Sequence, residues 1–425
     1  MAIDTPARIA VLGAGPIGLE AALYGRYLGY DVDVYERGGI AQNLIDWGHV
    51  RLFTPFGGNR TALALAALAA QDPAWRPPDD DALLTGREHA ERYLLPLARS
   101  DLLEGSIHEQ TRVVAVGRTE WMKGDLVADE ARGDDLFRIL LDSGGQERTA
   151  QANVIIDATG TYGNHNWLGR GGIPAVGERA LADRIEYGLP DILGRDRASY
   201  AGCRVLVVGS GYSAATNIVL LAELAAQSPA TQITWITRRP PEPADGPAGG
   251  PVRLVPGDRL SERERMAKVA NALAASGGAV QHRSGTMVDR VEWQADKDSF
   301  LVHLSHDGPA ETVEVDRIIA NVGYRPDNSL FAELQVHECY ATSGPMKLAA
   351  RLAAHPSHDC LDQPPSSASA LLNPEPNFYI LGAKSYGRNS NFLLSTGFDQ
   401  VRQVFSIVAD RADLDLYATA GKSRP

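Results

Sequence analysis

The hydrophobic positions of this chain fall into short β-branched runs that alternate with longer alanine- and leucine-rich runs. The short runs predict buried strands of parallel sheets at residues 7–12, 31–36, 153–160, 203–208, 232–237 and 377–382. Helices are predicted from about residue 16, from about residue 212 and over residues 396–411. Period-two patterns near 112–116, 137–141 and 147–150, and again near 287–293, 300–305 and 311–315, predict two meanders. Strands that alternate with helices in this way indicate an α/β fold.

A glycine-rich turn joins the first predicted strand to the first predicted helix. In it, Gly13 permits the tight turn, Gly15 lets the backbone approach a pyrophosphate, and Gly18 allows the helix to pack closely on the sheet. Pro16 is tolerated at the first position of a helix, and Ile17 follows it. The free amides of such a helix N-terminus favour phosphate. This segment therefore predicts a dinucleotide site.

An acidic residue closes the same unit. Glu36 ends the second predicted strand, 18 residues after Gly18, where its carboxylate can bind both hydroxyls of a ribose. We assign the adjacent Arg37 to the same cofactor-binding site. Strand, turn, helix, second strand and terminal acid occur in the order that the motif requires, which argues against a turn without a ligand.

A second glycine-rich turn follows the strand at 203–208. Gly209 and Gly211 repeat the first two glycines, and Ala214 takes the place of the third, which is a permitted variant. Tyr212 and Ser213 stand where Pro16 and Ile17 stand in the first motif. A single motif of this kind is weak evidence, whereas two in one chain are strong. A chain that binds two dinucleotides usually passes electrons from one to the other.

The strand after the second motif ends in arginines. Arg238 and Arg239 can bind a 2′-phosphate, which an acid at this position would repel. This dipeptide predicts NADPH in the second site. The alternative is that one or both arginines are solvated loop charges.

Composition narrows the class of protein. At 425 residues the chain exceeds what one hydrophobic core supports, so two domains are expected. A net charge of −12 argues against a nucleic-acid partner or an anionic membrane. With no apolar run of membrane-spanning length and no hydrophobic signal region, we expect a cytoplasmic protein. A homodimer is left open.

The chain has three cysteines, Cys203, Cys339 and Cys360. They form no C-x-x-C pair and have no metal-ligand spacing, so no metal site is expected. A redox pair between Cys339 and Cys360 stays open, because the geometry of a disulfide cannot be read from sequence.

The order of these motifs resembles the two-dinucleotide-binding-domain flavoproteins, the group that holds thioredoxin-reductase-like enzymes and flavin-containing monooxygenases. The resemblance covers nearly the whole chain and implies two Rossmann-like domains, with an NADPH domain inserted into a split FAD domain. The implied limits are 1–162 and 321–425 for the FAD domain and 163–320 for the connector and the NADPH domain. The residues that match the family's motifs are Gly13, Gly15, Gly18 and Glu36 for FAD, Gly209, Gly211 and Ala214 for NADPH, Ala158, Thr159 and Gly160 at the crossover, Gly323 at the return crossover, and Val113 at the adenine contact.

The departures from the family pattern are informative. The dithiol of the reductase branch is missing, so thioredoxin-type disulfide reduction is disfavoured. The family places an acid on the ribityl chain directly after the glycine that corresponds to Gly382, but here Ala383 and Lys384 follow. The segment 163–187 occupies the place of the monooxygenase fingerprint without reproducing it.

Two polar loops supply the candidate catalytic residues. In the resembling fold, residues 47–60 lie beside the flavin ring, where monooxygenases of the group often place an asparagine, and Asn59 is the nearest analogue. Residues 382–392 precede the last helix and contribute Lys384 and Tyr386. His49 is a further candidate proton donor.

Together these features predict an FAD-dependent, NADPH-consuming oxidoreductase. The favoured activity is a monooxygenase that uses O₂ to oxygenate a small nucleophilic substrate containing nitrogen or sulfur. The alternative is a cysteine-poor thioredoxin-reductase-like flavin reductase that passes electrons to a protein or a small molecule. A cofactor-binding sensor without enzymatic chemistry is a third, less favoured reading.

Overall fold

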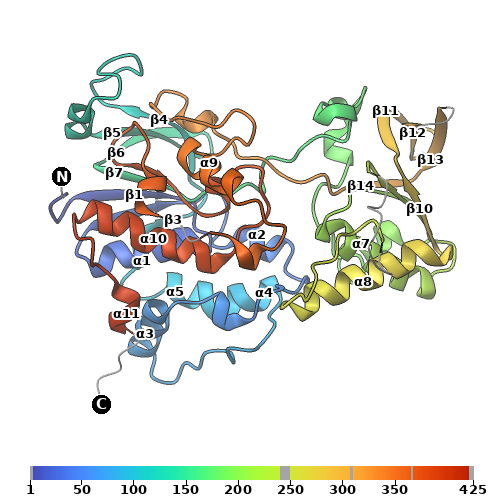
Figure 1. Ribbon diagram of the computed structural model, residues 1–425, viewed down its shortest axis with the longest axis horizontal. Coiled ribbons are helices and arrows are strands. Elements are labelled where there is room, and N and C mark those ends of the chain that lie inside the picture. Colours follow the sequence, from blue (N-terminus) through green and yellow to red (C-terminus); the bar gives the residue numbers. More distant parts are fainter. Residues whose placement is uncertain (1–2, 240–248, 307–309, 365–366, 421–425) are drawn as a thin grey trace. The chain divides into compact units, whose positions relative to one another are not determined.

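The chain divides into two α/β units in a computed structural model that describes residues 3–239, 249–306, 310–364 and 367–420 (Figure 1). One unit comprises Met1–Asn164 and Arg325–Pro425, and His165–Tyr324 forms the other. The second unit is thus inserted into the sequence of the first.

A five-stranded parallel sheet forms the centre of the first unit, with strand order β15-β7-β1-β2-β3. A three-stranded antiparallel meander, β4-β5-β6, accompanies it. The strands are β1 (Arg8–Leu12), β2 (Asp31–Tyr35), β3 (Ile107–His108), β4 (Arg112–Arg118), β5 (Phe137–Ser143), β6 (Gln146–Ala152), β7 (Val154–Asp157) and β15 (Phe378–Ile380). The helices are α1 (Pro16–Tyr27), α2 (Gln42–Asp46), α3 (Ala62–Gln71), α4 (Gly86–His89), α5 (Leu95–Ala98), α9 (Met346–Ala354), α10 (Leu394–Val408) and α11 (Leu416–Ala420), and a π-helix spans Ala90–Leu94.

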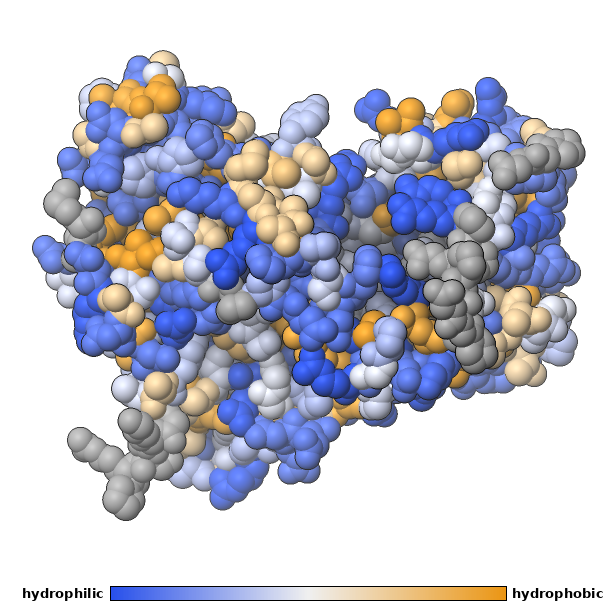
Figure 2. Space-filling view, in the orientation of Figure 1, coloured by the Kyte–Doolittle hydropathy of each residue, from blue (hydrophilic) through white to orange (hydrophobic). Residues whose placement is uncertain are grey.

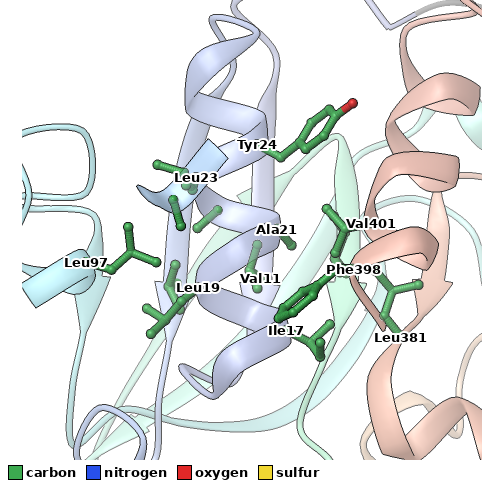
Figure 3. Close-up of a cluster of buried hydrophobic side chains, with 14 of the residues drawn as sticks. Val11, Ile17, Leu19, Ala21, Leu23, Tyr24, Leu97, Leu381, Phe398 and Val401 are labelled. Carbon is green, nitrogen blue, oxygen red and sulfur yellow. The ribbon is translucent and has the colours of Figure 1, made fainter. Parts of the chain in front are cut away.

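Alternation along β1 explains how this sheet is buried on both faces. Ile9 and Val11 belong to the core formed with α1 and α10, whereas Ala10 and Leu12 belong to the core formed with the meander. Figure 3 shows the first core, where Phe398 of α10 lies beside α1. Each large apolar side chain buried in this way contributes about 1.5–3 kcal/mol.

The second unit repeats the plan with a four-stranded parallel sheet, β10-β9-β8-β14, and a meander, β11-β12-β13. One core lies between β8, β9 and β14 and the meander, and it includes Leu206, Ile236, Phe300 and Val302. The strands are β8 (Arg204–Val208), β9 (Gln232–Thr237), β10 (Val280–Ser284), β11 (Met287–Gln294), β12 (Ser299–Ser305), β13 (Glu311–Val315) and β14 (Arg317–Ala320). The helices are α6 (Arg197–Tyr200), α7 (Tyr212–Gln227) and α8 (Ser261–Ser276).

The predicted fold class, with two Rossmann-like sheets, is confirmed. The sequence patterns did not predict α8, β10 or the two-residue strand β3. The helix predicted over 396–411 is α10, which spans Leu394–Val408 and so begins and ends slightly earlier. On the face drawn in Figure 2, hydrophilic residues predominate and apolar side chains form small separate groups. Among the described residues, no helix has the length and apolarity that crossing a membrane requires.

Candidate nucleotide-binding and redox site

Four predicted segments of the first unit follow strands that end at the carboxyl edge of its parallel sheet. Tyr35, Leu12, Asp157 and Ile380, which lie at or near the carboxyl ends of β2, β1, β7 and β15, occupy neighbouring positions in register. The segments that follow these strands therefore begin side by side. They carry the first glycine turn, Glu36, the crossover residues 158–160 and Gly382. This edge is where ligands bind in open α/β sheets.

The first glycine turn has the geometry of a phosphate cradle. Gly13 has φ +97°, and a Cβ there would lie 2.9 Å from the carbonyl oxygen of Ala158. A Cβ on Gly18 would lie 1.9 Å from the Gly13 oxygen, so only glycine fits. A Cβ on Gly15, by contrast, meets no atom within 4 Å. Pro16 begins α1, and no side chain caps the helix N-terminus. The residues present thus fit a pyrophosphate in the open space at Gly15.

Glu36 is fixed over this turn by two backbone amides. Its carboxylate accepts hydrogen bonds from Ala14 N and Gly38 N, each at 2.8 Å. The segment that leads to Val113 is held beside it, because Thr111 N donates to the Glu36 carbonyl at 2.8 Å. A carboxylate has further acceptor sites, so Glu36 can still bind sugar hydroxyls. Arg37 is exposed, and its guanidinium occupies the space that a side chain at position 163 would need.

Lys384 is buried and ion-paired. Its Nζ lies 2.6 Å from Asp157 Oδ2 and 3.1 Å from Thr159 Oγ1, and its side chain is 1% exposed. Asp157 is the last residue of β7, so the pair links the segment after β15 to the crossover. The neighbouring Gly382 has φ +71°, and its amide donates to Gln400 Oε1 at 2.9 Å.

The other two candidate catalytic residues are also buried. Burial raises the pKa of the Tyr386 phenol, which therefore stays protonated at neutral pH. Asn59 makes both of its bonds to one residue, because Oδ1 accepts from the Thr54 hydroxyl at 2.7 Å and Nδ2 donates to the Thr54 carbonyl at 2.9 Å. Asn59 thus fixes the loop 47–60, and its proposed catalytic role remains a prediction.

The second unit has a similar turn at the carboxyl edge of its own sheet. Gly209 has φ +132°, and a Cβ there would lie 2.2 Å from the Asn321 carbonyl oxygen. A Cβ on Gly211 meets no atom within 4 Å. Ala214 is fully buried in α7 behind Tyr212 and Ser213. The buried indole of Trp235 donates to the Gly209 carbonyl at 2.7 Å, which fixes the turn from the neighbouring strand.

Arg238 and Arg239 are both exposed and follow β9 directly. This is the position that Glu36 has after β2 in the first unit. Gly323 has φ +84°, and its carbonyl accepts from Asn166 N at 2.9 Å. The second unit thus presents positive charge at the place where the first presents a carboxylate.

None of the three cysteines, all of which lie among the described residues, forms a disulfide. Cys203 immediately precedes β8, at the amino end of the sheet and thus opposite the glycine turn. Cys339 is half-buried, and hydrogen bonds from the Thr342 side chain and nearby amides lower the pKa of its thiol. Its turn contacts the loop after Gly382, because Arg388 N donates to the Thr342 carbonyl at 2.8 Å.

Two buried titratable residues were not predicted from sequence. Glu20, on α1, accepts a hydrogen bond from the Thr61 hydroxyl at 3.0 Å, and burial raises its pKa to about 7. His89 is fully buried beside Phe56 and Tyr93, and burial lowers its pKa to about 4. A charged residue among the apolar positions 19 and 21–23 was a signal for Glu20. No sequence pattern marked His89.

The fold of this chain is that of known FAD- and NADP-binding structures. The bacillithiol disulfide reductase Bdr (YpdA) from Bacillus cereus has a TM-score of 0.66 and 18% identity, covering 95% of this chain and 99% of that chain. DfoA bound to FAD, a cadaverine monooxygenase from Erwinia amylovora, has a TM-score of 0.62 and 15% identity, with coverages of 96% and 95%. The Kutzneria ornithine N-hydroxylase KtzI has a TM-score of 0.59 and 16% identity, covering 95% of this chain and 99% of that chain. No family model matches the chain, and neither does any curated protein sequence.

Proposed function

We propose that the chain is an FAD-dependent, NADPH-consuming monooxygenase that oxygenates a small substrate through a nucleophilic nitrogen or sulfur atom. The observation that carries this proposal is the presence of two open phosphate cradles in one chain, at Gly15 and at Gly211, with opposite charge beside them. Glu36 suits a sugar with free hydroxyls, and Arg238 and Arg239 suit a 2′-phosphate.

The first unit is the proposed flavin site. The open space at Gly15 and the uncapped start of α1 would hold the pyrophosphate, Glu36 a ribose, and the segment at Val113 the adenine. When bound, FAD supplies the redox chemistry that accepts electrons from NADPH and activates O₂. The chain's own residues bind it, orient it and exclude water.

One feature favours oxygenation over disulfide reduction, namely that the chain has no C-x-x-C dithiol. Within the described residues, no two cysteines are joined by a disulfide. The structural relatives include the cadaverine monooxygenase and the ornithine N-hydroxylase as well as the bacillithiol disulfide reductase, so their fold does not decide between the two activities. The names of the two monooxygenases give cadaverine and ornithine as their substrates, and both compounds belong to the proposed class of small compounds with a nucleophilic nitrogen or sulfur.

The test is a search for oxygenated product under ¹⁸O₂. Purified protein with NADPH should oxidise the cofactor faster when a suitable amine or thiol is added, and the product should gain one labelled oxygen atom. Substrate-stimulated NADPH oxidation that proceeds equally without O₂ would reject the monooxygenase. Binding of both cofactors without any NADPH oxidation would indicate a sensor.

A single-thiol flavin reductase is the second candidate, supported by the lowered pKa of Cys339. A thiolate is the form that attacks a disulfide. If electrons leave through this sulfur, Cys339→Ser should abolish turnover and leave reduction of the flavin by NADPH intact. Cys360→Ser is the matched control. The monooxygenase predicts that both variants keep turnover within a few-fold.

A further inference from the structure

Three residues at the crossover form a closed hydrogen-bond unit. Lys384 Nζ donates to Asp157 Oδ2 at 2.6 Å and to Thr159 Oγ1 at 3.1 Å. Thr159 in turn donates through its hydroxyl to Asp157 Oδ1 at 2.7 Å and through its amide to the same oxygen at 3.1 Å. Asp157 and Lys384 are 0% and 1% exposed, whereas Thr159 is exposed. The unit therefore keeps its charges buried, and Thr159 is its exposed member.

The hydrogen-bond donors and acceptors that this unit has left unused decide what it can bind. A hydroxyl has one proton to donate, and the proton of Thr159 is committed to the Asp157 carboxylate. A lysine ammonium can only donate hydrogen bonds, so the bond from Lys384 occupies one lone pair of Thr159 Oγ1. The remaining lone pair of Thr159 Oγ1 can accept a hydrogen bond, but the hydroxyl has no second proton to donate to a phosphate. Its matching ligand is therefore a hydrogen-bond donor such as an alcohol.

The unit is attached directly to the phosphate cradle. A Cβ on Gly13 would lie 3.2 Å from Thr159 Cα, so the crossover packs against the first glycine of the turn. The loop that carries Lys384 packs against α1, the helix that follows this turn, because an Ile17 side-chain atom lies 3.5 Å from the Cβ position of Gly382. An alcohol at Thr159 would thus adjoin the group bound at Gly15.

We propose that Thr159 accepts a hydrogen bond from a ribityl hydroxyl of FAD, and that the buried Asp157–Lys384 pair fixes the direction of that bond. This proposal rests on the proposed FAD site. It also explains how the chain manages without an acid after Gly382, because the acceptor comes from the segment after β7 and Lys384, two residues after that glycine, positions it. Lys384 is then a positioning residue that does not itself contact the flavin.

The first experiment compares FAD with ADP, which contains the adenosine and pyrophosphate part of FAD but no ribityl chain. Dissociation constants are measured on the full chain after removal of flavin. Thr159→Val should weaken FAD about fivefold to tenfold, as expected for the loss of one hydrogen bond, and leave ADP unchanged. Thr159→Ser should restore FAD binding to within about threefold of the wild type, since it keeps the hydroxyl.

The second experiment measures the midpoint potential of the flavin in variants that change the charge of the pair. A purely structural role of the pair would not make this potential depend on its charge. In the FAD-loaded protein, Lys384→Met leaves an unpaired carboxylate near the flavin and should lower its midpoint potential, while Asp157→Asn leaves an unpaired ammonium and should raise it. The double variant is neutral and should return close to the wild type. Lys347→Met, an exposed lysine of α9, is the matched control and should change nothing.

Three outcomes separate the possibilities. Equal weakening of FAD and ADP by Thr159→Val, or no weakening of either, would overturn the ribityl assignment. Shifts of the potential in the same direction for both single charge variants would overturn the positioning role of the pair. If the wild-type chain binds ADP but not FAD, the result rejects the proposed flavin function itself, on which the ribityl assignment rests.

Discussion

The two glycine turns of this chain have the same backbone and different surroundings. In both, the second glycine faces open space and begins an uncapped helix. They differ where the next strand ends, with Glu36 held by two amides in one unit and two exposed arginines in the other. They differ again within the helix, where Glu20 of α1 corresponds to Thr216 of α7. One motif thus supplies the phosphate site, and single side chains around it set the charge that selects the nucleotide.

The largest expected effects come from filling either cradle. Gly15→Val places a branched side chain where the pyrophosphate should lie, and we expect FAD affinity to fall by roughly 100-fold or more, about 2.7 kcal/mol. The variant should fold normally, since Gly15 has φ −79° and its Cβ meets no atom within 4 Å. Flavin absorbance of the purified protein measures the loss. Full flavin content in this variant would contradict our assignment of the first cradle.

Gly211→Val is the matched change in the second unit, with φ −84° and the same open space. It should keep flavin and lose NADPH binding, also by roughly 100-fold or more. Titration with NADPH, followed by flavin reduction without O₂, checks this prediction. The two variants together test whether the first unit binds FAD and the second binds NADPH, because each variant is the control for the other. Loss of both cofactors in both variants would show that the two sites do not act separately.

The buried carboxylate of α1 predicts a pH-dependent cost in stability. The pKa of Glu20 is about 7 in the folded state against 4.5 ordinarily, so folding favours the neutral acid. Both states carry the neutral acid below about pH 4.5, the penalty on folding grows between pH 4.5 and about 7, and it is constant above that pH. Glu20→Gln should therefore be more stable than the wild type by about 3 kcal/mol at pH 8 and equal to it near pH 4.

Urea unfolding of the flavin-loaded protein at several pH values measures this difference. Thr216→Val, at the corresponding position of α7, is the comparison, and its effect on stability should not depend on pH. Thr216 carries no titratable group, and its hydroxyl donates only to the Tyr212 carbonyl at 2.9 Å. A pH-independent difference for Glu20→Gln would show that folding does not shift the pKa of this carboxyl.

The smallest predicted effect concerns the choice of nicotinamide cofactor. Replacing Arg238 and Arg239 with glutamine should weaken NADPH by about 10- to 150-fold, since a charge-assisted hydrogen bond contributes about 1.5–3 kcal/mol. Binding of NADH, which has no 2′-phosphate, should stay nearly unchanged. Steady-state kinetics with both cofactors provide the measurement. Equal use of NADPH and NADH by the wild type would mean that the arginines are solvated loop charges.

Local patterns were sufficient for the nucleotide turns. Gly13, Gly15 and Gly18 are required by the backbone itself, through a positive φ, an open approach and a close helix contact, and each requirement is visible in the spacing. The strands around them are continuous apolar runs, which is the pattern of sheets covered on both faces. The sequence therefore determined the two Rossmann-like units and the edge at which each turn lies.

Only the tertiary structure decided what the polar loop residues do. Lys384 is separated from Asp157 by 227 residues, and nothing local indicates that strand pairing between β15 and β7 brings their charges to 2.6 Å. Asn59, Glu20 and His89 are likewise defined by burial and by partners that the fold supplies. Backbone requirements are local and leave a signature in the residue types, whereas the role of a polar side chain depends on which distant groups desolvate it and satisfy its hydrogen bonds.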